Sequence, residues 1–201
     1  NSVITHKVNG EKYIIEKSAP THNEAVSVMI EQLTNNDYGV VKSLDDINAI
    51  GHRIVHGGEL FNKSVIITNE VIETIRECAD LAPVHNPAAL MGIEACQKLM
   101  SNKKMVAVFD TAFHQTIEKD TYLYPIPYKY YENYKIRKYG FHGTSHSYVS
   151  KRVAEIANKP LEELRTIVCH LGQGASLCAV KGGKSVASGV GTILALNPMV
   201  G

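Results

Sequence analysis

Residues 104–110, KMVAVFD, decide the fold class, because this largely apolar run ends in a carboxylate. A run of this length bounded by polar residues is typical of a buried strand. The segment before it starts with Asn86-Pro87, which favours a capped helix start, and continues with Leu90 and Ile93 at helical spacing. Strands and helices therefore alternate, and the sequence predicts an α/β protein.

Further strands and helices are predicted on either side of this strand. Asn9-Gly10 favours the positive backbone angles of a type I′ turn, so residues 2–17 are expected to form a β-hairpin. Helices are expected after a cap at Asn23, after a cap at Asn69, and from 145 to about 158 before Pro160. Strands are expected over 52–55, 65–68, 166–171, 175–180 and 185–187. A short turn capped by Asp45 is expected to carry Ile50 and to be ended by Gly51, and the tyrosine-rich stretch 122–139 is expected to be a loop.

Composition argues against several classes of protein. The 201 residues include 21 Lys+Arg and 20 Asp+Glu, a net charge of +1 that gives no field for holding a polyanion, so neither nucleic acid nor an anionic membrane is an expected partner. No apolar run approaches the roughly 20 residues of a membrane-spanning helix. The cysteines form no C-x-x-C pair and are expected to be reduced core residues of a cytoplasmic protein: Cys78, Cys96, Cys169 and Cys178.

Polar residues suited to chemistry gather where the expected strands end. Arg53 precedes the turn HGGE at residues 56–59. Its guanidinium can hold a carboxylate or a phosphate through two parallel hydrogen bonds, and paired glycines let a backbone approach a ligand. Taken alone, this cluster is better explained as a surface ion pair beside a turn.

Two further candidates lie at a helix start and at a strand end. His85 precedes the helix start, where free N–H groups and the helix dipole attract anions, although packing beside the cap explains it better when it is taken alone. Asp110 follows its strand at the edge where ligands gather in open α/β sheets. It is expected either to hold a hard metal such as Mg²⁺ or to cap a helix.

Two motifs in the second half of the chain suit anion binding. FHGTSH, residues 141–146, places His142 and His146 four apart as in a zinc pair, but the Glu of H-E-x-x-H is absent, so anion binding at a helix start is favoured. HLGQGAS, residues 170–176, is a glycine hairpin whose backbone N–H groups offer a phosphate cradle. It matches neither a Walker loop nor a Rossmann fingerprint, and a plain hairpin turn is the alternative.

Five motifs, in this order, resemble one family, the acetate kinases and their propionate and butyrate kinase relatives. They are HRIVHGGE (52–59), APVHNPAAL (82–90), VFDTAFHQT (108–116), YGFHGTSH (139–146) and CHLGQGAS (169–176). The resemblance covers residues 1 to about 186 and favours an acetate kinase. It implies the actin/sugar-kinase/Hsp70-like (ribonuclease H-like) two-domain α/β fold, each domain present in part, with residues 1–112 in a substrate-side domain and 113–201 beginning a nucleotide-binding domain.

The resemblance also implies roles for individual residues. Arg53 is expected to bind the acetate carboxylate or the phosphoryl group, His142 to hydrogen-bond the transferring phosphoryl group, and Asp110 to be the catalytic aspartate and a possible Mg²⁺ contact. The other implied roles are a pocket for the acetate methyl group made by Val55, Val84 and Phe141, a turn for the nucleotide phosphates made by His170, Gly172, Gln173 and Gly174, and support of an anion or transition state by His85 and His146.

The reaction implied by the resemblance is ATP + acetate ⇌ ADP + acetyl phosphate with Mg²⁺, and its chemistry agrees with these roles. The acceptor carboxylate is already ionised at neutral pH and needs no general base, so Asp110 is better employed in holding Mg²⁺ or aligning the reactants. A propionate or butyrate kinase is the alternative, since one methylene in an apolar pocket discriminates by only about 1–3 kcal/mol. An inactive fragment or pseudoenzyme that retains the fold is a second alternative.

The sequence departs from the family pattern in four places. Gln173 stands where the family usually has Asn. The family's Asn-x-Gly-Ser-Ser-Ser turn and its second essential arginine are both missing from the chain. The chain is therefore expected to be an incomplete member without measurable turnover of its own, whereas the intact enzyme is expected to be a homodimer. The stretch 187–201, ASGVGTILALNPMVG, also differs from the family, and nothing in the sequence explains it.

Overall fold

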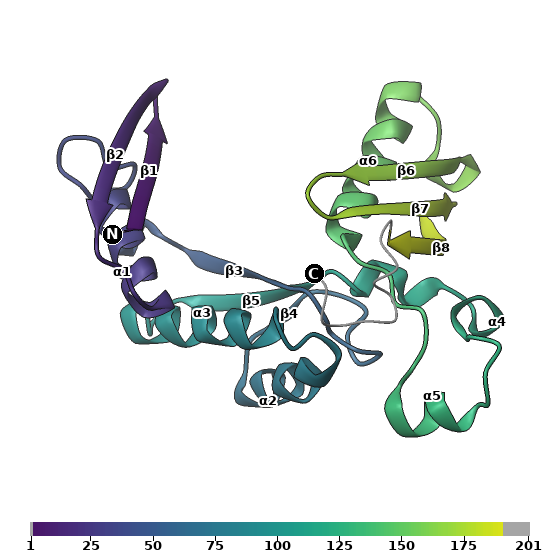
Figure 1. The fold of residues 1–201 in the computed structure, drawn as a ribbon. Helices are drawn as coiled ribbons and strands as arrows, with labels where there is room; N and C mark the ends of the chain where they lie inside the picture. Colours follow the sequence, from purple (N-terminus) through teal and green to yellow (C-terminus); the bar gives the residue numbers. More distant parts are fainter. Residues whose placement is uncertain (1, 191–201) are drawn as a thin grey trace.

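The computed structural model describes residues 2–190. Within them a β-hairpin lies at one end, a sheet of order β3-β5-β4 in the middle, and a sheet of order β6-β7-β8 at the other end (Figure 1). The strands and α-helices are β1 (Ser2–Val8), β2 (Glu11–Lys17), α1 (His22–Leu33), β3 (Ala49–Ile54), β4 (Val65–Ile66), α2 (Asn69–Glu77), α3 (Asn86–Leu99), β5 (Lys104–Phe109), α4 (Lys119–Tyr122), α5 (Lys129–Tyr134), α6 (Gly143–Ala157), β6 (Arg165–Leu171), β7 (Ala175–Lys181) and β8 (Lys184–Val190). The predicted α/β class is confirmed.

The N-terminal hairpin has the predicted turn. Asn9 and Gly10 both take positive φ, 50° and 85°, and Val8 pairs with Glu11 across the loop. This is the backbone that a type I′ turn requires, because its twist matches that of the two strands.

The helix that follows the hairpin begins two residues earlier than a cap at Asn23 predicts. Thr21 is the N-cap: its hydroxyl accepts a hydrogen bond from the backbone N–H of Glu24, and the Glu24 carboxylate accepts one from the N–H of Thr21. The reciprocal pair satisfies two backbone donors at once, which a lone Asn23 cap cannot do.

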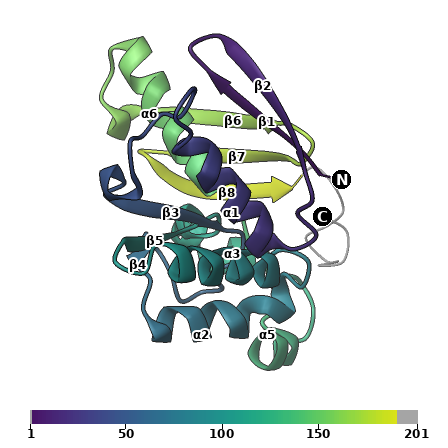
Figure 2. The same ribbon diagram turned by 90° about the vertical axis from the view of Figure 1, so that its left-hand side faces the viewer.

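The central sheet contains the strand over 104–109 as predicted. β5 pairs in parallel with β3 and antiparallel with β4. Figures 1 and 2 both place α2 and α3 on the same side of this sheet. Between the helices and the sheet lies a core of buried apolar side chains, each of which stabilises the fold by about 1.5–3 kcal/mol: Ile54, Ile75, Leu90, Ile93 and Phe109.

The approach to β3 differs from the prediction. The strand starts at Ala49, so Ile50 belongs to it and not to the preceding turn, and Gly51 lies inside the strand. The short 3₁₀ helix before it is capped by Ser43, whose hydroxyl accepts from the N–H of Asp45. The predicted cap at Asp45 is wrong because a serine two residues upstream already satisfies that N–H.

Two of the other predicted helix caps are also wrong. Thr68 caps α2, and Asn69 is its first residue. Asn86 opens α3 without capping it, because the Asn86 amide is fully buried and bonded elsewhere: it accepts from the N–H of His56 at 3.2 Å and donates to the carbonyls of His56 and Ile75 at 2.9 and 3.1 Å. The side chain therefore ties α2, α3 and the turn after β3 together.

The second half of the chain has more helix than predicted. The stretch 122–139 includes the end of α4 and all of α5, which ends at Lys135 in a left-handed conformation. Helix α6 starts at Gly143, two residues before the predicted start, and packs against β6. Cys169 is exposed, so its prediction as a core residue is wrong, whereas Cys78, Cys96 and Cys178 are buried as free thiols. Of the stretch 187–201, residues 187–190 lie in β8 and the rest lies outside the described residues.

Among residues 2–190 no helix combines the length and the apolar character needed to cross a bilayer.

We expect Asn86→Ala to lower the free energy of unfolding by about 1–3 kcal/mol, because buried backbone groups of His56 and Ile75 lose their partners. Urea unfolding followed by circular dichroism measures the change. The control is Asn23→Ala, which removes an exposed asparagine that caps nothing and should shift stability by less than about 0.5 kcal/mol. Equal effects of the two variants would contradict the assigned role of Asn86.

Candidate active site

Arg53 and Asp110 meet at the carboxyl ends of two parallel strands. The Arg53 guanidinium donates from Nε to Asp110 Oδ1 at 3.0 Å and from Nη2 to Oδ2 at 2.6 Å. The carboxylate is buried, with 2% of its side chain exposed, whereas the arginine side chain is 63% exposed. The two-point contact with this buried carboxylate raises the pKa of Arg53. The carboxylate thus holds the arginine in one orientation, with much of the arginine side chain open to solvent.

The backbone of Asp110 joins the central sheet to the start of α6. Its N–H donates to the carbonyl of Ile54 at 2.9 Å, and its carbonyl accepts from the N–H of Gly143 at 3.0 Å. A Cβ on Gly143 would lie 2.3 Å from that carbonyl oxygen, so only glycine permits this approach. Asp110 caps no helix: the 3₁₀ helix η3 (Ala112–Thr116) has Thr111 as its N-cap. The alternative reading of Asp110 as a cap is wrong.

His142 lies immediately before α6 in a left-handed conformation, with φ 55° and ψ 28°. A residue other than glycine in this region costs on the order of 1–3 kcal/mol and is enriched at functional sites. The pKa of His142 is lowered, first by burial and then by the charge of His170, while Asp110 opposes the shift and Arg53 adds to it. His142 therefore shares the electrostatic environment of the Arg53–Asp110 pair.

Four histidines cluster around the start of α6. The ring of His142 stacks on that of His170 at 4.2 Å between centroids, and His146 and His114 lie 5.6 Å apart. His170 Nδ1 lies 2.9 Å from the hydroxyl of Ser145. Burial is the largest cause that lowers the pKa of His114 and of His146, each to about 4.

The glycine turn between β6 and β7 runs beside this cluster. A Cβ on Gly174 would lie 3.5 Å from Cε1 and Nε2 of His142, and one on Gly172 would lie 3.9 Å from Nε2 of His170. The structure therefore brings the predicted phosphate turn, including Gln173 between the two glycines, next to the predicted phosphoryl-contacting histidine.

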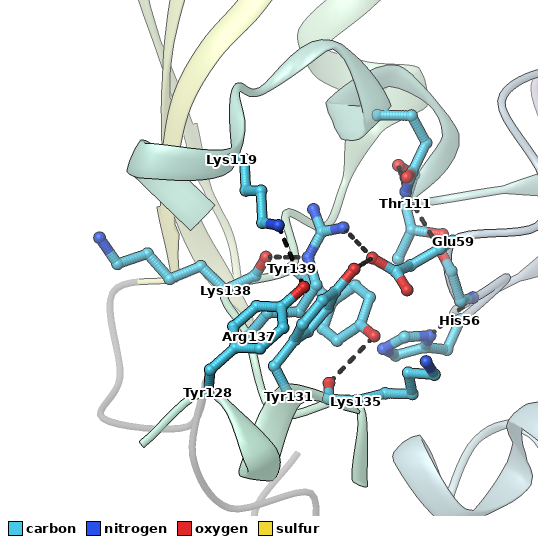
Figure 3. A network of polar contacts seen from close by, with 12 residues as sticks. His56, Glu59, Thr111, Lys119, Tyr128, Tyr131, Lys135, Arg137, Lys138 and Tyr139 are labelled. Atoms are coloured by element: carbon cyan, nitrogen blue, oxygen red, sulfur yellow. Dashed lines mark hydrogen bonds and ion pairs between the residues drawn. The ribbon is translucent and has the colours of Figure 1, made fainter. Parts of the chain in front are cut away.

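A polar network that the sequence motifs did not predict holds the turn HGGE in place (Figure 3). Arg137, almost fully buried, donates from Nη1 to Glu59 Oε1 at 2.6 Å, and the Tyr131 hydroxyl donates to the same oxygen at 2.9 Å. The Arg137 guanidinium also lies 3.5 Å above the ring of Tyr122. Because a buried charge without a partner is costly, this network fixes the turn after β3 against the segment that leads to His142.

The remaining predicted residues lie around this turn. The ring of Phe141 is 5.4 Å from that of His56, which directly follows Val55. Val84 is 57% exposed, and His85 is the N-cap residue of α3 but makes no capping hydrogen bond with its side chain. A hollow of about 330 Å³ beside the hairpin, lined by Tyr13 and Tyr38 among others, contains none of the predicted site residues.

The residues around Asp110 indicate which metal ion it could bind. Residues 2–190 contain no group of three or more His, Cys, Asp or Glu side chains placed to enclose a metal ion. A single carboxylate nevertheless fits Mg²⁺, which takes one or two protein carboxylates and completes its shell with phosphates and water. His142 and His146 converge on the hydroxyl of Ser176, not on a common empty point as zinc ligands would.

Sequence reasoning missed several residues that hold the site together. Ser176 contacts two histidines, Ser185 contacts His114 at 2.8 Å, and the Thr111 hydroxyl accepts from the N–H of Gly57 at 3.1 Å. Ser176 closes the CHLGQGAS motif, and a polar residue at a buried position of an otherwise apolar strand was the available signal. Ser185 gave no comparable signal, because its partner is 71 residues away.

We expect the protein to lose stability as pH falls from about 6.5 to about 4. Burial lowers the pKa of His56, His114 and His146 to about 4, whereas histidine in the unfolded chain titrates near 6.5, so the unfolded state binds more protons in this window. Each of these histidines then lowers the free energy of unfolding by up to about 1.4 kcal/mol per pH unit. Urea unfolding between about pH 7.5 and pH 5 measures the slope.

The variant His114→Gln should make that slope shallower, while His22→Gln, which replaces an exposed histidine at the start of α1, should leave it unchanged. A slope that is the same in the unaltered protein and in His114→Gln would contradict the assignment.

Comparison with known proteins identifies the family. A family model described as the acetokinase family matches residues 1–201. Curated acetate kinases of Thermoanaerobacterium thermosaccharolyticum and Clostridium acetobutylicum are both 56% identical to this chain, over 191 and 190 residues. These alignments cover 95% and 94% of this chain but 48% and 47% of the relatives. The chain therefore spans about half the length of the curated relatives it matches.

Solved structures give the same result. The crystal structure of Porphyromonas gingivalis acetate kinase superposes with a TM-score of 0.86 at 48% identity, covering 91% of this chain and 46% of that one. A propionate kinase from Francisella tularensis superposes with a TM-score of 0.86 at 41% identity, covering 94% and 47%. The expected fold is confirmed, and the chain belongs to the acetokinase family.

Proposed function

We propose that the gene product carrying this sequence is an acetate kinase, which transfers a phosphoryl group between ATP and acetate to give ADP and acetyl phosphate. The observation that carries the proposal is the contact of Arg53 with buried Asp110 at the ends of β3 and β5, with the backbone of Asp110 bonded to the residue after His142. Membership of the acetokinase family and 56% identity to curated acetate kinases support it.

Phosphoryl transfer demands positioning and charge neutralisation more than acid–base chemistry. The acetate carboxylate is ionised at neutral pH, so no residue has to remove a proton from it. Arg53, oriented by Asp110 and 63% exposed, offers guanidinium N–H groups to the carboxylate or to the phosphoryl oxygens. In this proposal Asp110 aligns the arginine and is not a general base.

His142 and the glycine turn supply hydrogen-bond donors on the other side of the same region. His142 donates to an oxygen of the transferring phosphoryl group, and the backbone N–H groups of residues 172–174, together with His170, receive the nucleotide phosphates. His85 and His146 support the bound anion from farther away. Mg²⁺, held by Asp110 and the phosphates, would neutralise charge on the phosphate oxygens.

The same proposal extends to substrate choice and organisation. Val55, Val84 and Phe141 form the pocket for the methyl group of acetate. Residues 1–112 form the substrate-side domain and residues 113–201 begin the nucleotide-binding domain. We further propose that the whole enzyme is a cytoplasmic homodimer.

The proposal has two alternatives. A propionate kinase is the first, because a structure so named superposes as well as an acetate kinase does. A protein that keeps the fold without activity is the second, and the assay below distinguishes it from an active kinase.

The test is to incubate the enzyme with ATP, Mg²⁺ and acetate, propionate or butyrate, and to trap the corresponding acyl phosphate with hydroxylamine as its hydroxamate. The assay is run on the gene product and, separately, on the chain of residues 1–201. Highest kcat/KM with acetate supports the proposal, whereas highest kcat/KM with propionate favours the first alternative. No turnover by the gene product would overturn the proposed function.

We expect Arg53→Ala and Asp110→Ala each to lower kcat at least about 100-fold in the gene product, because each removes charge placement that acts mainly in the transition state. Initial rates with saturating acetate and ATP measure the effect. Arg76→Ala, which removes an exposed arginine of α2 paired with Glu73, is the control and should leave kcat unchanged. A kcat near that of the unaltered enzyme in Arg53→Ala would refute the assigned role.

We expect Val55→Ala to shift the preference of the enzyme from acetate toward propionate and butyrate, because a larger pocket accepts an extra methylene, a difference of about 1–3 kcal/mol. The ratio of kcat/KM values for the three acids measures it. Val40→Ala, which changes an exposed valine outside the proposed pocket, is the control. Unchanged ratios in Val55→Ala would argue against the pocket.

A further inference from the structure

One hydroxyl group lies between two histidines of the cluster. Ser176, fully buried on β7, has its Oγ 2.7 Å from Nδ1 of His142 and 2.8 Å from Nε2 of His146. Both distances are those of strong hydrogen bonds. Ser176 also pairs with His170 in the β6–β7 register, so the position of its hydroxyl is fixed by the sheet.

The protons of this arrangement follow from what each group can donate. A serine hydroxyl donates one hydrogen bond, and a neutral imidazole has one N–H and one bare nitrogen. Ser176 can therefore donate to only one of the two rings and must accept an N–H from the other. If it donates to His142 Nδ1, the proton of His142 is on Nε2; if it accepts from His142 Nδ1, Nε2 of His142 is bare.

The other nitrogen of His146 distinguishes the two arrangements. His146 Nδ1 is buried and has no hydrogen-bond partner among residues 2–190. An orphaned buried N–H is rarer than an under-used buried acceptor, so Nδ1 is the bare nitrogen and Nε2 carries the proton. His146 Nε2–H then donates to Ser176, and the Ser176 hydroxyl donates to His142 Nδ1.

We propose that Ser176 and His146 are positioning residues that hold the proton of His142 on Nε2, so that this ring presents a neutral N–H donor to a phosphoryl oxygen. The phosphoryl contact rests on the proposed function, whereas the position of the proton does not. Nε2 is the appropriate nitrogen because it faces the glycine turn: a Cβ on Gly174 would lie 3.5 Å from it.

The groups that face His142 are compatible with a neutral ring. They come from each neighbouring element: Asp110 after β5, Arg53 on β3, His170 on β6 and His146 on α6. Burial, His170 and Arg53 lower the pKa of His142 against the single opposing carboxylate. A doubly protonated His142 would leave Ser176 to accept two N–H groups with no acceptor for its own proton, which further disfavours the charged form.

The position of the proton can be measured directly. In the gene product labelled with ¹⁵N-histidine, imidazole nitrogen shifts and their couplings to ring protons identify the tautomer of each histidine at neutral pH. We expect Nε2–H for both His142 and His146. Nδ1–H in His142 would overturn the proposal whatever the enzyme catalyses.

Variants then test whether the hydrogen bonds from His146 to Ser176 and from Ser176 to His142 matter for activity. Ser176→Ala should lower kcat on the order of tenfold while the KM for ATP and for acetate changes by less than about twofold. The magnitude follows the analogy of metal-bound histidines, for which loss of the hydrogen-bond partner of the ring typically costs about 10–100-fold. Ser150→Ala is the matched control, because it removes another buried hydroxyl that donates only to Ser147 on the same helix. It should leave kcat and the His142 spectrum unchanged.

His146 supplies a rescue experiment. His146→Gln keeps an N–H donor near the Nε2 position and should retain more activity than His146→Leu, with both checked for folding by urea unfolding. Equal kcat in Ser176→Ala and the unaltered enzyme, or equal loss in His146→Gln and His146→Leu, would refute the positioning role. Absence of kinase activity together with the expected tautomers would instead refute the proposed function alone.

Discussion

Asp110 bonds to two of the segments that carry the proposed site, β3 and the start of α6. Its carboxylate receives two hydrogen bonds from Arg53, its N–H donates to Ile54 on β3, and its carbonyl accepts from Gly143 at the start of α6. A buried carboxylate is costly unless it is paired, so the contact with Arg53 offsets much of the cost of burying Asp110. The orientation of the arginine is therefore a consequence of how the sheet is assembled.

The polar groups around Asp110 divide into one cation and several neutral donors. Arg53 carries the exposed positive charge, whereas burial lowers the pKa of His114, His142 and His146 and keeps these rings neutral near pH 7. Neutral rings can be packed together because they do not repel one another. The Ser176 hydroxyl links His142 to His146, and the Ser185 hydroxyl contacts His114. Charged histidine rings in the same cluster would repel one another.

The sequence predicted the elements that depend on a few adjacent residues. It misassigned helix caps where two neighbouring residues could both serve as the cap. The Asn9-Gly10 turn and the strand over 104–109 depend on a few adjacent residues and were predicted within their bounds. Helix caps were wrong where a threonine or serine competed with a nearby Asn or Asp, as at Thr21 and Thr68. Asn86 had no such competitor; its amide was taken by backbone groups 11 and 30 residues away.

The site itself depends on contacts between distant segments, which explains why only its motif residues were predictable. Arg137 meets Glu59 across 78 residues and Ser176 meets His142 across 34, so no local pattern identifies the partner in either contact. The glycines of YGFHG show the same dependence from the opposite side. A Cβ on Gly140 would lie 2.2 Å from the His114 ring, so this motif glycine is required by a side chain that only the folded chain brings to it. A glycine in a short sequence motif can therefore reflect a packing contact with a residue far away in the sequence.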